Sequence, residues 1–545
     1  MPSRAPHLPP VWLLLWSCLA LFAIFQHGPM PLYSTRTLAV AWEMWNSGQF
    51  LVPHINGQPY SHKVPLLFWL IHAGWAVFGV SDIWPRVLQV GIGAGWLAAS
   101  AALARRVLVL RPAAATSVPW LLIALAYPFL FGLQLMYETL LALCVVLALW
   151  AIHGRPRWGW FAVALGAGLL TKGPVMLLHV AFPLLLGPWW SEYARADRRG
   201  WYLRAGLAVG ASLAILLAWA LPAGMAGGEA YRNELLFLQT AGRVVDSFDH
   251  ARPLYWYLPM LLVLLFPWVA WPRLWRAAFA QRPRLDDASR FLASWLLPTF
   301  GVFCLVSGKQ VYYLLPLLPA AGMAIALVLA RTIPEATLTR RRWRAWPLAL
   351  LLIALALVLL ALSIGLVDAQ RGPRWMADIA GIGGWFAPGF ILLGAVLLLW
   401  PHERHAVERI ATVALCAAVL AQMLFAQTLF RNFDLRPAAA RIALAQAAGR
   451  PVANLGGYAG QFHFLGRLAQ PIDDIHTRDL PAWTQQHPHG MVVRYPARSD
   501  PRAPERAEWI QPFRSRQLEI WDAGALAKFE AVAVSSPPAE ADPEP

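Results

Sequence analysis

Lysine is scarce in this 545-residue chain, and the positions of the few lysines indicate a chemistry. Of 45 basic residues only four are lysines, namely Lys63, Lys172, Lys309 and Lys528. The first three adjoin apolar segments and stand apart from the arginine-rich loops. A compact ammonium acts as a point charge toward phosphate groups. Together the first three lysines predict a phosphate site, although each lysine alone is equally well explained as a side chain that reaches lipid headgroups.

Three acidic positions are candidates for a catalytic carboxylate. Glu138 lies in LMYETLL at a short turn between two apolar segments, and Asp249 with His250 precedes another such segment. Glu43 lies on an amphipathic stretch, where a solvated helix face is the simpler explanation. Ionisable residues at membrane depth are expensive and suggest function. We therefore expect Glu138 to be the functional carboxylate before Glu43 or Asp249.

The elements that position these residues are apolar segments long enough to cross a roughly 30 Å hydrocarbon core. Hydrophobic residues make up 58% of the chain and charged residues 14%, a composition typical of membrane proteins. We expect an all-α, multi-pass membrane domain with about thirteen transmembrane helices. The predicted spans are 11–27, 88–104, 118–133, 139–152, 158–171, 174–188, 205–223, 254–272, 291–307, 311–330, 347–367, 384–400 and 408–428.

The distribution of basic residues predicts the orientation. With a cytoplasmic N-terminus, the inner loops hold 22 basic residues and the outer loops 10, as the positive-inside rule requires. An odd number of spans places the C-terminal tail outside, which for a bacterial inner membrane means the periplasm. The net charge of +16 is spread over short loops, which argues against nucleic-acid binding. The four cysteines fall within spans and show no metal-ligand spacing, so no metal site is expected.

Three regions follow from this pattern. Residues 1–430 form the membrane domain, whose first outer segment has two stretches, 37–47 and 64–79, expected to lie along the membrane surface. Residues 431–534 are expected to form a small α/β domain, with a helix at 436–448 and strands at 451–455, 490–495 and 530–534. Residues 535–545, rich in Pro, Ala and Glu, are expected to be disordered.

Five motifs, in order, resemble those of one glycosyltransferase superfamily. They are the T-R, E-M, V-P-x-x-x-G-x-x-Y and Lys63 pattern of 35–79, then MYETLLAL, LTKGP, RVVDSFDHARPLYWYLP and SGKQVYYLLPLLP. This series is similar to that of the GT-C glycosyltransferases related to lipid A aminoarabinose transferase and protein O-mannosyltransferases. The resemblance covers about residues 1–430, and the tail occupies the place of the superfamily's periplasmic domain.

The resemblance implies a GT-C fold and a reaction at the outer face of the membrane. A sugar would pass from a polyprenyl (undecaprenyl) phosphate carrier, the co-substrate, to a cell-envelope acceptor such as lipid A or another glycan, or less readily a protein. No further cofactor is required. The residues implied at the donor phosphate are Arg36, Lys63, Arg243, His250, Lys309 and Tyr313, with Glu138 as the second carboxylate.

The chain departs from the superfamily at the catalytic acid of the first outer loop. That residue is expected at Tyr33 or Ser34, and neither is a carboxylate. Three explanations stay open: Glu138, Glu43 or Asp249 supplies the base; the acceptor is already ionised, as a phosphate is, so that positioning suffices; or transfer activity is lost. The alternative function is therefore a silent lipid-phosphate-binding or scaffold protein. A secondary transporter is a third possibility, but its paired broken helices are not evident.

Overall fold

The computed structural model describes residues 10–235, 252–280, 285–331, 345–369, 372, 374–400, 405–497 and 500–535. The chain forms two compact units. The first, the helical unit, comes from residues 1–27 and 61–428, and the second, the α/β unit, comes from residues 28–60 and 429–545. The first outer segment is therefore divided: its N-terminal half belongs with the tail, and its second half, from Ser61 on, belongs with the helices.

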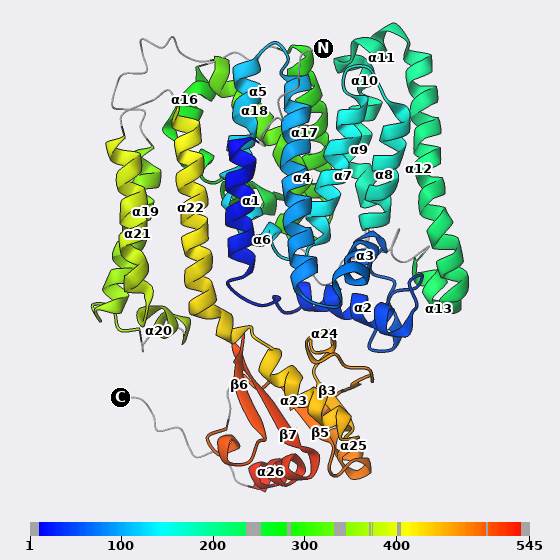
Figure 1. Ribbon diagram of the computed structural model, residues 1–545, viewed down its shortest axis with the longest axis vertical. Helices are drawn as coiled ribbons and strands as arrows, with labels where there is room; N and C mark the ends of the chain where they lie inside the picture. The colour runs from blue at the N-terminus through cyan, green and yellow to red at the C-terminus, as the bar shows by residue number, and fades with distance from the viewer. Residues whose placement is uncertain are drawn as a thin grey trace. The chain divides into compact units, whose positions relative to one another are not determined.

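In the helical unit, long helices lie side by side, and long helices that follow one another in the chain run in opposite directions (Figure 1). Its α-helices are α1 (Val11–Ile24), α3 (Leu66–Phe78), α4 (Ile83–Val107), α5 (Pro112–Ile123), α6 (Ala126–Gly132), α7 (Tyr137–Ile152), α8 (Trp158–Lys172), α9 (Val175–Leu185), α10 (Gly187–Trp190), α11 (Glu192–Ala196), α12 (Arg198–Ala226), α13 (Gly228–Asn233), α15 (Tyr257–Leu264), α16 (Pro272–Phe279), α17 (Asp287–Leu305), α18 (Leu318–Arg331), α19 (Trp346–Ser363), α20 (Arg374–Ala380), α21 (Gly383–Leu399) and α22 (Ala406–Gln427). The 3₁₀ helices η3 (Leu254–Trp256), η4 (Trp268–Ala270) and η5 (Val311–Leu317) adjoin α15 and α18.

Within the described residues, six helical segments are long and apolar enough to cross a membrane, and the bent pair α5–α6 makes up to seven. The pair bends by 50° inside the span expected at 118–133. Pro128 has no N–H to donate to the carbonyl of Ala124, so the helix breaks there. The expected total of thirteen stays a prediction, because helices such as α7 and α8 have 16 and 15 residues, fewer than the roughly 20 that a straight span needs.

The α/β unit is built on a five-stranded sheet of order β4-β3-β5-β7-β6. Strands β3 (Val452–Leu455), β4 (Asp473–Ile475) and β5 (Met491–Arg494) are parallel, whereas β6 (Trp509–Phe513) and β7 (Arg516–Asp522) are antiparallel to their neighbours. Each face has its own apolar core. The other elements are α2 (Ser34–Ser47), β1 (His54–Ile55), β2 (Gln58–Pro59), η9 (Leu429–Asn432), α23 (Arg436–Ala447), α24 (His463–Gly466), η10 (Thr477–Asp479), α25 (Leu480–Gln486), η11 (Ala503–Glu505) and α26 (Ala523–Ser535).

One strand expected from the sequence is a helix instead. Residues 530–534 alternate in a strand-like way, but they belong to α26. Leu526 and Phe529, three residues apart, are both buried, which is the spacing of one helix face and not of one strand face. The apolar core under this part of the sheet is therefore supplied by a helix that covers it.

Candidate functional site

A buried ion pair lies where α7 begins and α8 ends. The Nζ atom of Lys172 is 2.7 Å from Oε1 of Glu138, and the two side chains are 16% and 8% exposed. The helices α7 and α8 are packed antiparallel, so the N-terminal turn of one lies beside the C-terminal turn of the other. A carboxylate is favoured at a helix N-terminus and an ammonium at a C-terminus. The local sequence therefore places both charges where the helix dipoles stabilise them.

Tyrosine rings surround this pair. The Lys172 ammonium lies 4.4 Å from the ring centre of Tyr313 and 5.8 Å from that of Tyr312, both on η5. Lys63 lies 4.8 Å from the ring centre of Tyr137, the residue before Glu138. Lys63 is also near enough for its charge to act on the Glu138 carboxylate. Cation–π contacts of this kind strengthen when they are desolvated. The cluster thus holds two ammonium groups and one carboxylate at one end of the helices.

The loop that carries Lys63 is held by a second acidic residue. Ser61 is buried, and its hydroxyl donates a 2.6 Å hydrogen bond to Oε2 of Glu234, just beyond α13. This bond ties the segment before α3 to the residues that follow α12. Glu234 lies two positions before residues 236–251, which contain Arg243, Asp249 and His250. Those three predicted site residues lie outside the described residues.

Lys309 has a different environment from the other two lysines. It is only 2% exposed, and its ammonium donates to the carbonyl oxygens of Val306 and, at 3.1 Å, Arg252. The N–H of Arg252 in turn donates to the Ser307 carbonyl at 3.1 Å. Lys309 therefore binds backbone carbonyls that join the SGKQ loop to the start of η3. Its predicted contact with a phosphate stays a prediction.

Glu43, on α2 of the α/β unit, has both carboxylate oxygens occupied. They accept the N–H groups of Asn56 and Gly57 at 2.5 and 2.9 Å, which fixes the β1–β2 turn. Burial raises the pKa of the Glu43 carboxyl above its usual range. Oε1 of Glu43 lies 3.5 Å from Nε2 of His463, a ring that burial keeps neutral by lowering its pKa to about 4. This contact is therefore not an ion pair at neutral pH, and the arrangement favours a structural role for Glu43.

Two further predicted positions of the first outer loop lie on or beside α2. Tyr33, which precedes the helix, is 44% exposed, whereas Ser34 is buried. Arg36 is on the first turn, and its Nε atom is buried without a hydrogen-bond partner in the described part of the chain. No carboxylate from residues 33 or 34 is available at this helix start, as the sequence already indicated.

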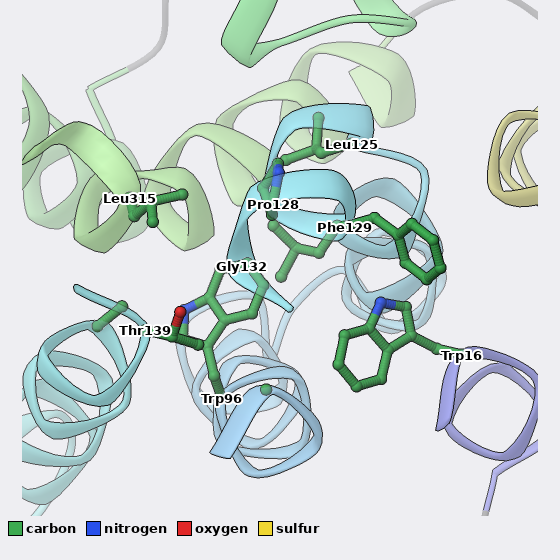
Figure 2. A pocket seen from close by; sticks show the side chains of 11 residues that line it. Trp16, Trp96, Leu125, Pro128, Phe129, Gly132, Thr139 and Leu315 are labelled. Carbon is green, nitrogen blue, oxygen red and sulfur yellow. The ribbon is translucent and has the colours of Figure 1, made fainter. Parts of the chain in front are cut away.

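A small apolar cavity lies beside the ion pair within the helical unit. Figure 2 shows its wall, to which α1 contributes Trp16, α4 Trp96, α6 Phe129 and α7 Thr139. The Thr139 hydroxyl and the Trp96 indole nitrogen are both buried and have no hydrogen-bond partner among the described residues. Thr139 directly follows Glu138, so apolar space begins one residue from the charged cluster. In the described residues there is no group of three or more His, Cys, Asp or Glu side chains placed to hold a metal.

Arginines gather at the opposite end of α7 and α8. Arg106 donates to the carbonyl of Trp150 near the end of α7, and Arg111 pairs with Asp286 at 2.7 Å. Arg195, on α11, pairs with Asp287 at 2.6 Å. The arginine-rich loops and the Glu138 cluster therefore occupy different ends of the same helices, which is the separation on which the predicted orientation depends.

Comparison with known proteins finds relatives named as arabinosyl transferases. No family model matches the chain. It is 27% identical over 413 residues to undecaprenyl phosphate-alpha-4-amino-4-deoxy-L-arabinose arabinosyl transferase 2 of Pseudomonas fluorescens strain Pf-5, covering 72% of this chain and 68% of the relative. It is 28% identical over 418 residues to the transferase of that name from Pseudomonas paraeruginosa strain PA7, covering 71% and 72%.

Solved structures agree with these relatives. The crystal structure of ArnT from Cupriavidus metallidurans bound to undecaprenyl phosphate matches with a TM-score of 0.68 at 20% identity, over 94% of this chain and 97% of that one. The apo structure matches with a TM-score of 0.70 at 19% identity, over 94% and 98%. The chain is a GT-C-fold relative of these transferases. The resemblance inferred from the five motifs is thereby confirmed at the level of the fold.

In this GT-C chain, the structure brings together part of the predicted site. Lys63, Glu138 and Tyr313 share one cluster, whereas the Lys309 ammonium donates to the backbone carbonyls of Val306 and Arg252. Sequence reasoning noticed Lys172 among the scarce lysines but gave Glu138 no basic partner. Glu234 was also missed, because nothing in the sequence pairs it with Ser61, 173 positions away.

Proposed function

We propose that this protein is an inverting glycosyltransferase that moves a sugar from a polyprenyl-phosphate carrier to a cell-envelope acceptor. The observation that carries the proposal is the cluster of Lys63, Lys172 and Glu138 in a chain related over about 70% of its length to undecaprenyl-phosphate aminoarabinose arabinosyl transferases. The relatives' names point to a 4-amino-4-deoxyarabinose donor on undecaprenyl phosphate. The acceptor that we propose, lipid A, comes from the motif resemblance and not from these names.

The reaction needs positive charge at the departing phosphate. When the bond between the sugar and its phosphate breaks, negative charge grows on the phosphate oxygens, and fixed ammonium groups stabilise it without reorganisation. Lys63 is the group for this role, because it is half-buried and stands on the α3 side of the cluster. Lys172 is already paired with Glu138, so it keeps the carboxylate ionised and in place.

The acceptor is most simply an ionised oxygen, as in a phosphate group. Glu43 is engaged with two backbone N–H groups, and neither Tyr33 nor Ser34 is a carboxylate. An acceptor that needs no deprotonation removes the requirement for a strong base, and positioning then supplies the rate. Glu138 would orient the acceptor or the sugar hydroxyls within the cluster.

The location follows from the same argument. We propose a multi-pass protein of the bacterial inner membrane, with a cytoplasmic N-terminus, about thirteen spans and a periplasmic α/β unit. The gathering of Arg106, Arg111 and Arg195 at the other end of the helices supports this orientation, since positive loops stay in the cytoplasm. The polyprenyl-phosphate-linked sugar is the co-substrate, and no other cofactor is proposed.

The test is sugar transfer from a radiolabelled undecaprenyl-phosphate donor to lipid A in membranes. Lys63→Met and Glu138→Gln should each lower the rate strongly. Arg195→Met, at the far end of α11, is the matched charge-removal control and should retain the rate. Transfer that persists in both site variants excludes this cluster as the active site.

A silent lipid-binding protein is the second candidate, and the missing carboxylate at positions 33 and 34 favours it. Tyr33 is exposed, so Tyr33→Asp is the better-tolerated way to restore that acid. A protein that binds undecaprenyl phosphate without turnover, and that gains transfer on Tyr33→Asp, would support the silent function over the active one.

A further inference from the structure

His179 is a buried histidine that the proposed chemistry does not use. It lies on α9, is fully buried, and neither ring nitrogen has a hydrogen-bond partner among the described residues. A buried polar group without a partner is unfavourable and calls for an explanation. Its ring packs against Phe303 of α17, with the ring centres 5.1 Å apart. Phe303 in turn lies 6.4 Å from Tyr313, the ring under the Lys172 ammonium.

Lys172 is the cation whose charge acts on this histidine. It is the last residue of α8, and α9 begins three residues later, after the break at Gly173. Side chains on a helix tilt toward its N-terminus, so the Lys172 side chain points back along α8. His179 stands just over one turn into α9, which runs back along α8, and the charge of Lys172 acts on its ring. The two side chains therefore approach the same depth from adjacent helices.

Glu138 has two tasks that conflict. It must hold the buried Lys172 ammonium, and under the proposed function it must also turn toward the substrate. An ammonium that loses its carboxylate inside a low-dielectric cluster needs another acceptor. A neutral imidazole has one nitrogen that accepts a hydrogen bond, and in His179 that nitrogen is unoccupied.

We propose that His179 is a positioning residue that accepts the Lys172 ammonium when Glu138 turns to the substrate. The ammonium moves between two acceptors, Glu138 in the resting protein and His179 in the loaded one, and stays over the Tyr313 ring throughout. The inference rests on the proposed function for the step in which Glu138 turns to the substrate. Whether His179 can accept the Lys172 ammonium is tested without turnover.

A stability cycle in detergent tests the exchange directly. Glu138→Leu removes the resting acceptor, and His179→Phe removes the second one while it fills the same space. In the parent protein, His179→Phe should leave the midpoint of thermal unfolding unchanged or higher, because it removes an unpartnered polar ring. In the Glu138→Leu background it should lower the midpoint by about 2 °C or more, because the ammonium then has neither acceptor. An equal effect in both backgrounds overturns the proposal.

Transfer kinetics give a second, independent measurement. His179→Phe should lower kcat by about tenfold with little change in KM, and His179→Gln, whose side-chain oxygen accepts a hydrogen bond, should restore most of the rate. In a Lys172→Met background, His179→Phe should have no further effect. Equal rates for the Phe and Gln variants overturn the positioning role. Failure of transfer in the parent protein counts against the proposed function, while the stability cycle still decides the exchange.

Discussion

Lys172→Met should destabilise the helical unit more than any surface charge removal. The carboxylate of Glu138 is 8% exposed and would lose its 2.7 Å partner, and removing one member of a buried pair costs about 3–5 kcal/mol. The nearby charge of Lys63 and the N-terminus of α7 offset part of this loss, the latter by about 0.3–1 kcal/mol. We therefore expect the lower end of the range, about 3 kcal/mol.

The double variant Glu138→Leu/Lys172→Met separates the ion pair from the packing. With both charges gone, neither position leaves a buried charge without its partner, so stability should return to within about 1 kcal/mol of the parent, while sugar transfer stays lost. Arg195→Met is the control, since Arg195 and Asp287 are 35% and 42% exposed and such pairs contribute about 0–1 kcal/mol.

The measurement is unfolding in detergent by titration with dodecyl sulfate, followed by tryptophan fluorescence. A Lys172→Met protein as stable as Arg195→Met would show that the pair is solvated. A double variant no more stable than the single one would place the loss in packing. Either result would refute the argument that Glu138 depends on Lys172 for its charge.

Three other outcomes are expected. Lys63→Met should lower transfer by at least about a hundredfold with little loss of stability, and Lys63→Arg should retain more activity, as measured with the labelled donor. Burial lowers the pKa of His463 to about 4, so between pH 6.5 and 4 the unfolded chain binds a proton that the folded α/β unit does not. Stability should therefore fall as the pH drops through that window, and His463→Gln should remove this dependence in thermal unfolding at stepped pH. Gly460→Ala should destabilise the α/β unit by about 1 kcal/mol or more beyond Gly48→Ala in the same assay. Both glycines have positive φ, but a Cβ on Gly460 would lie 2.9 Å from Ala39, whereas nothing lies within 4 Å of one on Gly48.

The GGYAG segment at 456–460 shows why some local patterns stay ambiguous in sequence. Taken alone it is a flexible turn, but the Tyr458 hydroxyl bonds the His463 ring at 2.6 Å and the Tyr458 N–H donates to Asp474 at 2.9 Å. The turn is thus fixed by residues outside it. Residues 530–534 are not a strand for a related reason, because they continue the helix α26, whose earlier residues Leu526 and Phe529 are buried at helical spacing.

What the sequence determined by itself was the kind of protein and the kind of chemistry. Long apolar segments require a bilayer, the arginine count predicts an orientation, and scarce lysines beside one acid pointed to phosphate before any relative was compared. These properties depend on composition and short-range order, which a linear sequence carries in full.

Only the tertiary structure decided which charges meet. Glu138 and Lys172 are 34 positions apart and become partners because α7 and α8 pack antiparallel, whereas the Lys309 ammonium donates to the backbone carbonyls of Val306 and Arg252. The sequence ranked Glu43 as a possible base, and the fold gives its two oxygens to a backbone turn. Pairing of distant charges depends on how helices pack and on how deeply each side chain is desolvated, and neither quantity is local to the sequence.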